Sequence, residues 1–334
     1  RLLRRAGATI TFVRNPRFRE WSHAAQPAGN PAAIVWRTYP SIDAALQAVE
    51  QGRADWIFGI LPPRELPRLR VDVPAQLHDN ASFIVDFIPL NTHVAPFDDV
   101  RVRRALNLAI DRQRIVTLYG GPSAATPICQ PLPAGFLGYH RICPYTARPA
   151  HDGVWRAPDL ARARRLVRAS GTRGDQIDVW GTSDNLGVPH GLPAYVASVL
   201  RSLGYRTRLR IRAGPHISYA LRRTFQLSVD GDWAPDYPGP SAFLPPFFGC
   251  GGNYTNGYVC DAGLDDTMRR ASAAELRAPD AAAGLWEKAD RTIVDRAYWV
   301  PTVSSHAPEL VSRRVGNYEV SPIWDFVADQ AWLR

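Results

Sequence analysis

The stretch PFDDVRVRRALNLAIDRQRIV, residues 96–116, predicts one amphipathic helix that ends at the glycine pair 120–121. Apolar side chains recur at helical spacing along it, and arginines occupy the opposite side. The carboxylates of Asp98 and Asp99 suit the start of a helix, where backbone N–H groups need acceptors and attract negative charge. The arginines expected on the solvated side are Arg101, Arg103 and Arg104.

Segments on both sides of this helix alternate between strand and helix patterns. Ile42 to Gln51 predicts a helix that Gly52 closes, because glycine tolerates the left-handed conformation at a helix end. Such alternation predicts an α/β organisation. The expected strands are 8–13, 54–60, 82–92, 176–183, 205–212, 225–233 and 298–304, and the other expected helices are 158–171, 192–204, 216–223, 261–273 and 279–296.

The length predicts two lobes, because 334 residues exceed what one hydrophobic core usually serves. Hydrophobic residues make up 46% of the chain and charged residues 21%, which is an ordinary globular composition. Residues 122–158 are rich in proline and contain two of the four cysteines. We therefore expect a long, stapled connection there, and with it a boundary between lobes.

The positive charge comes almost entirely from arginine, since Lys288 is the single lysine. A formal net charge of +9 is compatible with an anionic partner. Nucleic-acid binding is not expected, because no basic run is interleaved with stacking aromatics and no nucleic-acid motif occurs. An enzyme is not expected either, because the eight histidines are scattered and no metalloprotease, nucleophile-elbow or phosphate-loop motif occurs.

The four cysteines form two local pairs, Cys129 with Cys143 and Cys250 with Cys260, each across a loop. Such pairs are typical of disulfides in an oxidising compartment. Free buried thiols are the alternative. A zinc site is disfavoured, because zinc ligands usually come in pairs about two to four residues apart.

The first stretch of the chain, RLLRRAGATITFVRNPRF at 1–18, lacks the apolar run and the small-residue cleavage site of a signal peptide. No later segment is long and apolar enough to cross a bilayer. Taken alone, these two features indicate a cytoplasmic protein. The cysteine pairs indicate export, so we expect an extracytoplasmic protein whose export signal lies outside this chain.

The stretch GDWAPDYPGPSAF, residues 231–243, places Asp236 between Trp233 and Tyr237 in a loop rich in proline and glycine. An ionised carboxylate held away from water is costly unless a cation pairs with it. We therefore expect Asp236 to receive a cation from a ligand, with the two aromatic rings as walls. The alternative is that the rings pack beneath the loop while Asp236 caps the following turn.

Several segments, taken in order, resemble the family 5 extracytoplasmic solute-binding proteins, the peptide and nickel class that serves ATP-binding-cassette (ABC) importers. The helix at 96–116 and the W-x-x-D-Y pattern at 233–237 carry the resemblance, which covers essentially the whole chain. The cysteine pairs and the terminal AWLR resemble actinobacterial members. The supporting segments are NPRFREW, AVEQGRADWIFG, GPSAATP, PAGFLGY and RVGNYEVSPIWDFVADQAWLR.

The resemblance implies a two-lobed clamp of the type II periplasmic-binding-protein class, with mixed β-sheets flanked by helices. Such a clamp closes on a short peptide or related small solute and presents it to permease subunits. No cofactor and no metal are implied, and membrane association is expected only through a lipid anchor outside this chain. The chain enters the family pattern partway through lobe I, so the N-terminal part of the family fold is expected to be missing.

The resemblance also implies which residue ranges form the two lobes of the clamp. Residues 1–95 are the expected remainder of lobe I, and 96–121 the helix that leads into lobe II. Residues 122–305 are the expected lobe II, which contains the W-x-x-D-Y loop, and 306–334 the return to lobe I.

In peptide-binding members, the aspartate of the W-x-x-D-Y loop binds the amino terminus of the ligand, which implies this role for Asp236. Asp230 and Asp232 make the neighbourhood more acidic and favour cationic ligands. Further contacts are expected from Asn91, Asn253 and Tyr254, although Asn91 also suits a turn that satisfies its own backbone.

Short peptides lead among the expected ligands, ahead of nickel chelates, opines and sugars. Two alternative functions stay open: a solute-sensing domain of a regulatory fusion protein, and a truncated remnant without function. The ligand-binding lobes of an importer component and of a sensor would look the same in sequence.

Overall fold

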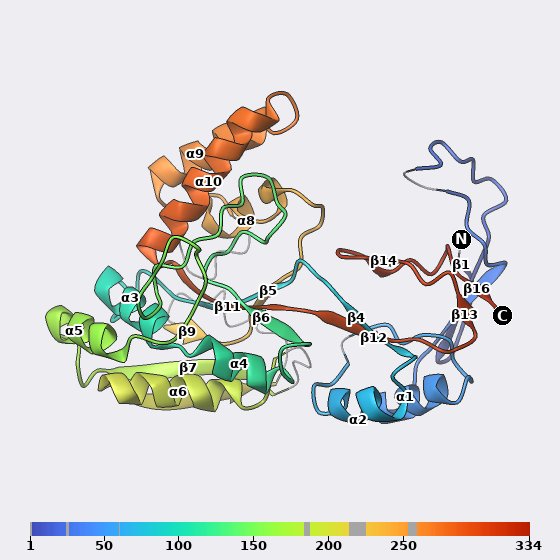
Figure 1. Ribbon diagram of the computed structural model, residues 1–334, viewed down its shortest axis with the longest axis horizontal. Coiled ribbons are helices and arrows are strands. Elements are labelled where there is room, and N and C mark those ends of the chain that lie inside the picture. The colour runs from blue at the N-terminus through green and yellow to red at the C-terminus, as the bar shows by residue number, and fades with distance from the viewer. Residues whose placement is uncertain (1, 25–26, 60, 184–187, 214–224, 253–258) are drawn as a thin grey trace. The chain divides into compact units, whose positions relative to one another are not determined.

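The computed structural model describes residues 2–24, 27–59, 61–183, 188–213, 225–252 and 259–334. The chain separates into two compact units (Figure 1). Unit 1 comprises Arg1–Ala81 and Ala307–Arg334, and unit 2 comprises Ser82–His306. Both units combine helices with sheets, which confirms the predicted α/β class.

Unit 1 is built from short antiparallel strands and two helices (Figure 1). α1 (Ile42–Glu50) begins where Ser41 Oγ accepts a hydrogen bond from Ala44 N, and α2 covers Leu66–Asp72. Gly52, at φ 70°, follows α1 as predicted. The sheets are β1 (Leu2–Ala6) with β2 (Thr9–Val13) and β3 (Ala33–Arg37); β4 (Leu77–Asn80) with β12 (Ala307–Leu310); β13 (Val315–Gly316) with β16 (Trp332–Leu333); and β14 (Val320–Ser321) with β15 (Asp325–Phe326).

The predicted strand at 54–60 is wrong within the described residues. Trp56 forms only an isolated bridge with Val311. Its ring instead packs edge-on against Trp36 and Phe326, with ring centroids 6.0 and 5.2 Å away. Aromatic packing, and not continuous strand pairing, therefore fixes this segment.

Unit 2 contains two sheets with different pairing (Figure 1). The antiparallel sheet has the order β10-β5-β11-β6, and the parallel sheet has the order β8-β7-β9. α6 (Leu192–Leu203) connects β7 to β8 and packs on both, as a parallel crossover requires. The strands are β5 (Val85–Pro89), β6 (Ala125–Pro127), β7 (Gln176–Thr182), β8 (Arg206–Arg212), β9 (Leu227–Ser228), β10 (Gly231–Trp233) and β11 (Trp299–Ser305).

The boundary between the units lies between Ala81 and Ser82, whereas the expected limit of the first segment was residue 95. β5 was expected in the first segment, but it pairs with β10 and β11 inside unit 2. Ser82 Oγ also donates to Ser305 O, which closes unit 2 at its two chain ends. The roles expected for the four segments in a ligand clamp stay predictions.

The helix predicted through residues 96–121 is two helices, α3 (Val100–Ala109) and α4 (Arg112–Leu118). Asp99 caps α3 by accepting a hydrogen bond from Arg101 N, as predicted for a helix start. Asp111 accepts a hydrogen bond from Arg114 N and starts α4 in the same way. An aspartate can satisfy the first free N–H groups of a new helix, which is why the pattern breaks there.

The expectation of a solvated face is wrong for Arg103. This side chain is buried and donates to three carbonyl oxygens, those of Phe97, Asp98 and Arg296. Arg101 is exposed, as predicted, and pairs with Asp99. A guanidinium can be buried without a carboxylate where several carbonyls accept its hydrogen bonds.

The strand predicted over 225–233 is two short strands in different sheets: β9 pairs with β7, and β10 pairs with β5. The chain thus passes from the parallel sheet to the antiparallel sheet just before the W-x-x-D-Y loop. The helix predicted at 216–223 lies outside the described residues.

Both predicted disulfides are confirmed, between Cys129 and Cys143 and between Cys250 and Cys260. Loops of this size stabilise the fold by about 3 kcal/mol each in the chain-entropy model. Asp290, a buried carboxylate of α10 (Pro279–Arg296), fastens the first loop by accepting hydrogen bonds from Leu132 N (3.1 Å) and Gln130 Nε2 (2.8 Å). Burial raises the pKa of Asp290 to about 7.

An aromatic core supports the antiparallel sheet of unit 2. Phe87 of β5 stacks on Trp299 of β11, and Trp286 of α10 is fully buried. Aromatic burial on this scale dominates the stabilisation of such a core. The remaining helices of unit 2 are α5 (Leu160–Ser170), α8 (Pro245–Phe248), α9 (Ala262–Ala274), α10 (Pro279–Arg296) and the 3-10 turn η1 (Pro240–Ala242).

Candidate functional site

Trp233 fixes the W-x-x-D-Y loop from inside. The residue ends β10, opposite Val85 of β5. Its indole Nε1–H donates to Ala242 O at 3.2 Å, which ties the two ends of the loop together. The ring meets Phe247 edge-on at 5.0 Å and packs on the aromatic core. Trp233 therefore holds the loop in place, and its expected contact with a ligand stays a prediction.

Asp236 and Tyr237 lie on the outer side of this loop. Both side chains are exposed, Tyr237 at 49%. The Tyr237 hydroxyl donates to Ser241 Oγ at 3.0 Å, so the ring has a fixed direction. The loop thus presents a carboxylate beside an anchored aromatic ring.

The other three predicted ligand residues are Asn91, Asn253 and Tyr254. Asn91 is fully buried; its Oδ1 accepts a hydrogen bond from His93 N, and its backbone N–H donates to Gln226 O. This is the turn geometry weighed as its alternative. Asn253 and Tyr254 lie outside the described residues. Ligand contacts by all three stay predictions.

The structure adds a group that sequence reasoning missed. Asp86, the second residue of β5, is buried directly opposite Asp232 of β10, and the Tyr119 hydroxyl donates to its Oδ1 at 2.7 Å. Burial raises the pKa of Asp86 to about 7, opposed by the Tyr119 hydrogen bond and assisted by the charge of Asp232. An aspartate inside the apolar run SFIVDFIPL was the available signal.

The geometry around Asp86 predicts that Asp86→Asn becomes more stable than wild type as the pH rises towards 7. The folded-state pKa lies above the ordinary 3.8, so the folded state binds this proton more tightly. The wild-type contribution is present at low pH and is lost as pH rises from about 4 to about 7. The variant should gain about 2 kcal/mol over wild type between about pH 5 and about pH 7. Urea unfolding of both proteins across this range measures it.

Parallel stability curves for wild type and Asp86→Asn would contradict this assignment. Asp232→Asn is the matched control, because it removes the neighbouring charge and leaves the Asp86 carboxyl in place. The pH dependence should then persist and shift to lower pH.

Comparison with known proteins places this loop in a family. The model of the bacterial extracellular solute-binding proteins, family 5 Middle, matches residues 4–255. The chain is also 30% identical, over 330 residues, to the probable di/tripeptide-binding protein 5 of Pseudomonas aeruginosa strain UCBPP-PA14. That alignment covers 94% of this chain and 57% of the relative. The chain belongs to family 5 of the bacterial extracellular solute-binding proteins.

Solved structures of peptide-binding proteins share the fold. The clavulanic acid biosynthesis oligopeptide binding protein 2 superposes with a TM-score of 0.83 at 21% identity, covering 100% of this chain and 62% of the other. The periplasmic binding protein DppA of Helicobacter pylori, in complex with the peptide STSA, gives 0.77 at 19% identity, covering 99% and 62%. These likenesses confirm the predicted fold class.

The chain and its curated relatives differ in length. The chain spans a little over half the length of the curated relatives that it matches, for example 57% and 56%. Family 5 members are extracellular solute-binding proteins of transporters and are not classed as enzymes. Among the helices that the structure describes, none has both the length and the apolar character needed to span a membrane.

Proposed function

We propose that this chain is the solute-capturing part of an extracellular binding protein that delivers short peptides to the permease of an ABC importer. The observation that carries the proposal is the rigid W-x-x-D-Y loop with its exposed Asp236, found in a chain whose relatives are named for di- and tripeptides. The H. pylori structure with STSA supports a peptide as the class of ligand.

The α-ammonium of the peptide is the cation that suits Asp236. An ammonium–carboxylate pair has charge-assisted hydrogen bonds, which are stronger than neutral ones, especially where water is excluded. Tyr237 lies next to the carboxylate with its hydroxyl held by Ser241, so its ring can pack against the first residue of the ligand without losing further freedom. The exposed carboxylate of Asp232, four residues before Asp236, favours ligands with net positive charge.

The wider setting follows from the same proposal. The protein acts outside the cytoplasm, held at the membrane by a lipid anchor beyond this chain, and its partners are the peptide and the permease subunits. It captures its ligand without chemical change. The two disulfides support an oxidising compartment.

A thermal-shift screen tests this function. The protein, expressed from the start of its reading frame and oxidised, is melted with di- to pentapeptides, amino acids, sugars, nickel chelates and heme. Heme is included because a Haemophilus influenzae relative, 25% identical, is named heme-binding protein A. A ligand present at about 100 times its Kd stabilises the folded state by about 2.7 kcal/mol, which raises Tm by about 5–10 °C.

We expect peptides with a free amino terminus to raise Tm and their N-acetylated forms to have no effect. N-acetylation removes the ammonium charge and leaves the rest of the peptide in place. A rise with sugars, nickel chelates or heme alone, or no rise at all from the folded protein, would contradict peptide capture.

A further inference from the structure

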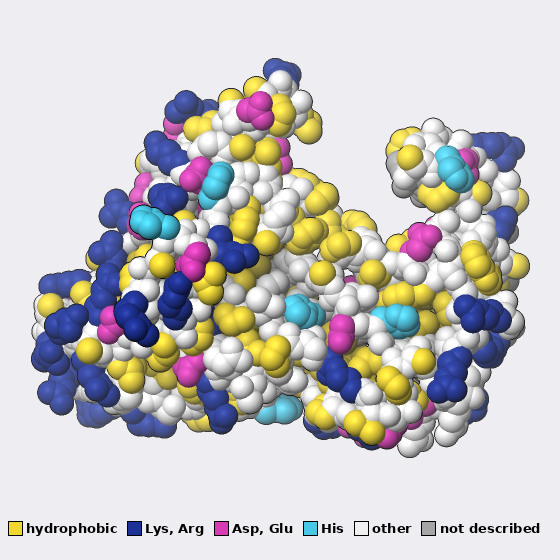
Figure 2. All heavy atoms as spheres, in the orientation of Figure 1, with side chains coloured by type: hydrophobic (Ala, Val, Ile, Leu, Met, Phe, Trp, Pro, Cys, Tyr) yellow, Lys and Arg dark blue, Asp and Glu magenta, His cyan; other side chains and the backbone are white. Residues whose placement is uncertain are grey.

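One stretch of unit 2 concentrates the positive charge of the chain. Between residues 160 and 212 there are ten arginines and three aspartates, a difference of seven, against a formal net charge of +9 for the whole chain. The stretch covers α5, α6 and β8 with their connections. Figure 2 shows the dark blue side chains gathered over this part of unit 2.

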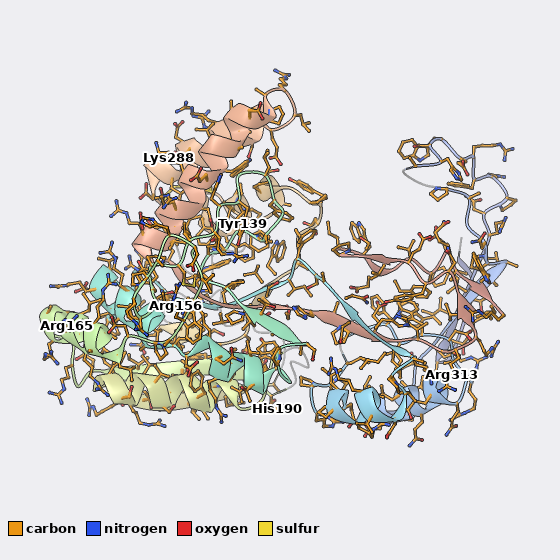
Figure 3. All side chains as sticks on the ribbon, in the orientation of Figure 1. Tyr139, Arg156, Arg165, His190, Lys288 and Arg313 are labelled. Atoms are coloured by element: carbon orange, nitrogen blue, oxygen red, sulfur yellow. A yellow bond between two sulfur atoms is a disulfide. The ribbon has the colours of Figure 1, made fainter. Side chains whose placement is uncertain are left out.

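Contacts hold these elements together, and we call six exposed arginines on them the arginine face. Arg164 Nε donates to Ser202 O at 3.2 Å and links α5 to the end of α6. Arg206 Nε donates to Gly174 O at 2.9 Å and links β8 to the loop after α5. All six side chains are exposed, and Figure 3 shows Arg165 projecting outward from α5. The arginine face consists of Arg164, Arg165, Arg168, Arg173, Arg201 and Arg206.

No carboxylate forms an ion pair with the arginine face within the described residues. The side chains of Arg165, Arg168 and Arg173 form no hydrogen bond or ion pair there, and the side chains of the other three donate to neutral oxygens. Asp175, exposed in the adjoining loop, forms no ion pair within the same residues.

Some arginines elsewhere on the surface form ion pairs with carboxylates. Arg68 lies within ion-pair distance of Glu50, Glu65 and Asp72. Another example is Arg156, which pairs with Asp152. A missing carboxylate partner is therefore not a property of every arginine in this arginine-rich chain, and the arginine face is distinguished by having six such side chains close together in the fold.

Local structure explains only part of this charge. Arg168 and Arg201 occupy the last turns of α5 and α6, where a cation interacts favourably with the helix dipole. Arg164, Arg165 and Arg173 have no such reason, and like charges this close repel one another. A surface that keeps unbalanced arginines is suited to a negatively charged partner.

The chemistry of the arginine face favours lipid phosphates as that partner. Its side chains come from α5, α6, β8 and the loop after α5, and a set of cations spread over several segments suits an extended anionic surface better than one small anion. In the described part of 160–212 the exposed large apolar side chains are Leu209 and Ile211, so there is no aromatic platform for nucleic-acid bases. Arginine binds phosphate oxygens through two parallel hydrogen bonds.

We propose that the arginine face docks unit 2 onto an anionic phospholipid surface. This contact goes beyond solute capture and does not depend on which ligand the W-x-x-D-Y loop takes. Each arginine near an anionic membrane raises the partitioning of the protein from solution to the membrane about fivefold. Six arginines therefore bind the protein to the membrane reversibly. The attraction weakens as salt screens it.

Vesicle co-sedimentation tests the proposal. The oxidised wild-type protein is mixed with phosphatidylcholine vesicles, with and without phosphatidylglycerol, at low and at physiological ionic strength. The variant Arg165→Gln/Arg168→Gln/Arg173→Gln removes three charges that have no partner in the fold. We expect binding only to the phosphatidylglycerol vesicles, and about a hundredfold weaker partitioning for the variant at low salt.

A matched control variant carries Arg269→Gln, Arg270→Gln and Arg277→Gln, which removes the same charge from α9 and the residues after it. We expect this control to bind like wild type, and both variants to melt like wild type because the substituted side chains are exposed. Equal losses in the two variants would overturn the proposal, because net charge alone would then explain binding. It would also be overturned by equal binding to the uncharged vesicles, by no vesicle binding, or by tighter binding to duplex DNA at matched salt.

Discussion

Asp236→Asn is expected to weaken the binding of a short peptide with a free amino terminus by about 2–5 kcal/mol, the range seen when one partner of a desolvated, hydrogen-bonded charge pair is removed. The asparagine keeps the size of the side chain and loses the charge. Because the loop is held by Trp233 and Ala242, and not by Asp236, the fold should be unaffected. Isothermal titration calorimetry with the best peptide from the screen measures the change.

The N-acetylated peptide turns this experiment into a double-mutant cycle. If Asp236 contacts the α-ammonium, acetylation should cost wild type several kcal/mol and should cost the Asp236→Asn variant little. Equal costs in both proteins would show that the ammonium is bound elsewhere. The coupling energy, and not the single loss, is the quantity that identifies the anchor.

Asp232→Asn separates a specific anchor from a general acidic field. Asp232 is exposed on β10, four residues before Asp236, and the substitution makes the same change in charge. We expect a loss below about 1 kcal/mol, typical of an exposed charge. A loss as large as that of Asp236→Asn would favour a diffuse attraction for cationic ligands over one defined pair.

Sequence reasoning predicted best those elements whose ends carry their own chemical signal. Asp99 at the start of α3 and Gly52 after α1 each satisfy the local requirement that the structure shows. These signals depend on neighbours in the sequence. The W-x-x-D-Y loop was found for the same reason, because its residues are contiguous.

Features that depend on distant residues were missed. The pairing of Asp86 with Asp232 exists only once β5 and β10 meet, across more than a hundred residues of chain. The hydrophobic pattern predicted that arginines on α3 face water, yet Arg103 finds acceptor carbonyls at both ends of unit 2's sequence. Hydrophobic periodicity shows which side of a helix is apolar, but it does not show which carbonyl groups of distant segments will accept hydrogen bonds from that helix.

Arg112 is the most consequential of these buried residues. It is the first residue of α4 and is fully buried. Its Nε donates to Ile128 O (2.7 Å) and Pro301 O (3.0 Å), and one terminal nitrogen donates to Asn107 O (3.2 Å). Burial lowers the pKa of Arg112 to about 10, so the side chain still carries its charge at neutral pH. One guanidinium thus joins the end of α3, the disulfide loop and β11.

Arg112→Met is therefore expected to destabilise unit 2 by about 3–5 kcal/mol, because buried carbonyls lose their donors while the apolar stem is kept. The expected fall in Tm is about 10 °C, measured by calorimetry on the oxidised protein. Arg114→Met is the control, since Arg114 lies exposed on the same helix and should change stability by less than about 0.5 kcal/mol. Equal effects of the two substitutions would show that α4 tolerates loss of the buried donors.

Arg112→Lys separates the charge from the geometry of the fork. Lysine keeps the positive charge but concentrates its donors at one nitrogen, which cannot reach the carbonyls of Ile128, Pro301 and Asn107 together. We expect lysine to recover less than half of the stability lost in the methionine variant. Full recovery of stability in the lysine variant would mean that a buried cation of any shape suffices at this position. The hydrogen bonds from one planar guanidinium to three segments would then no longer explain why Arg112 is buried.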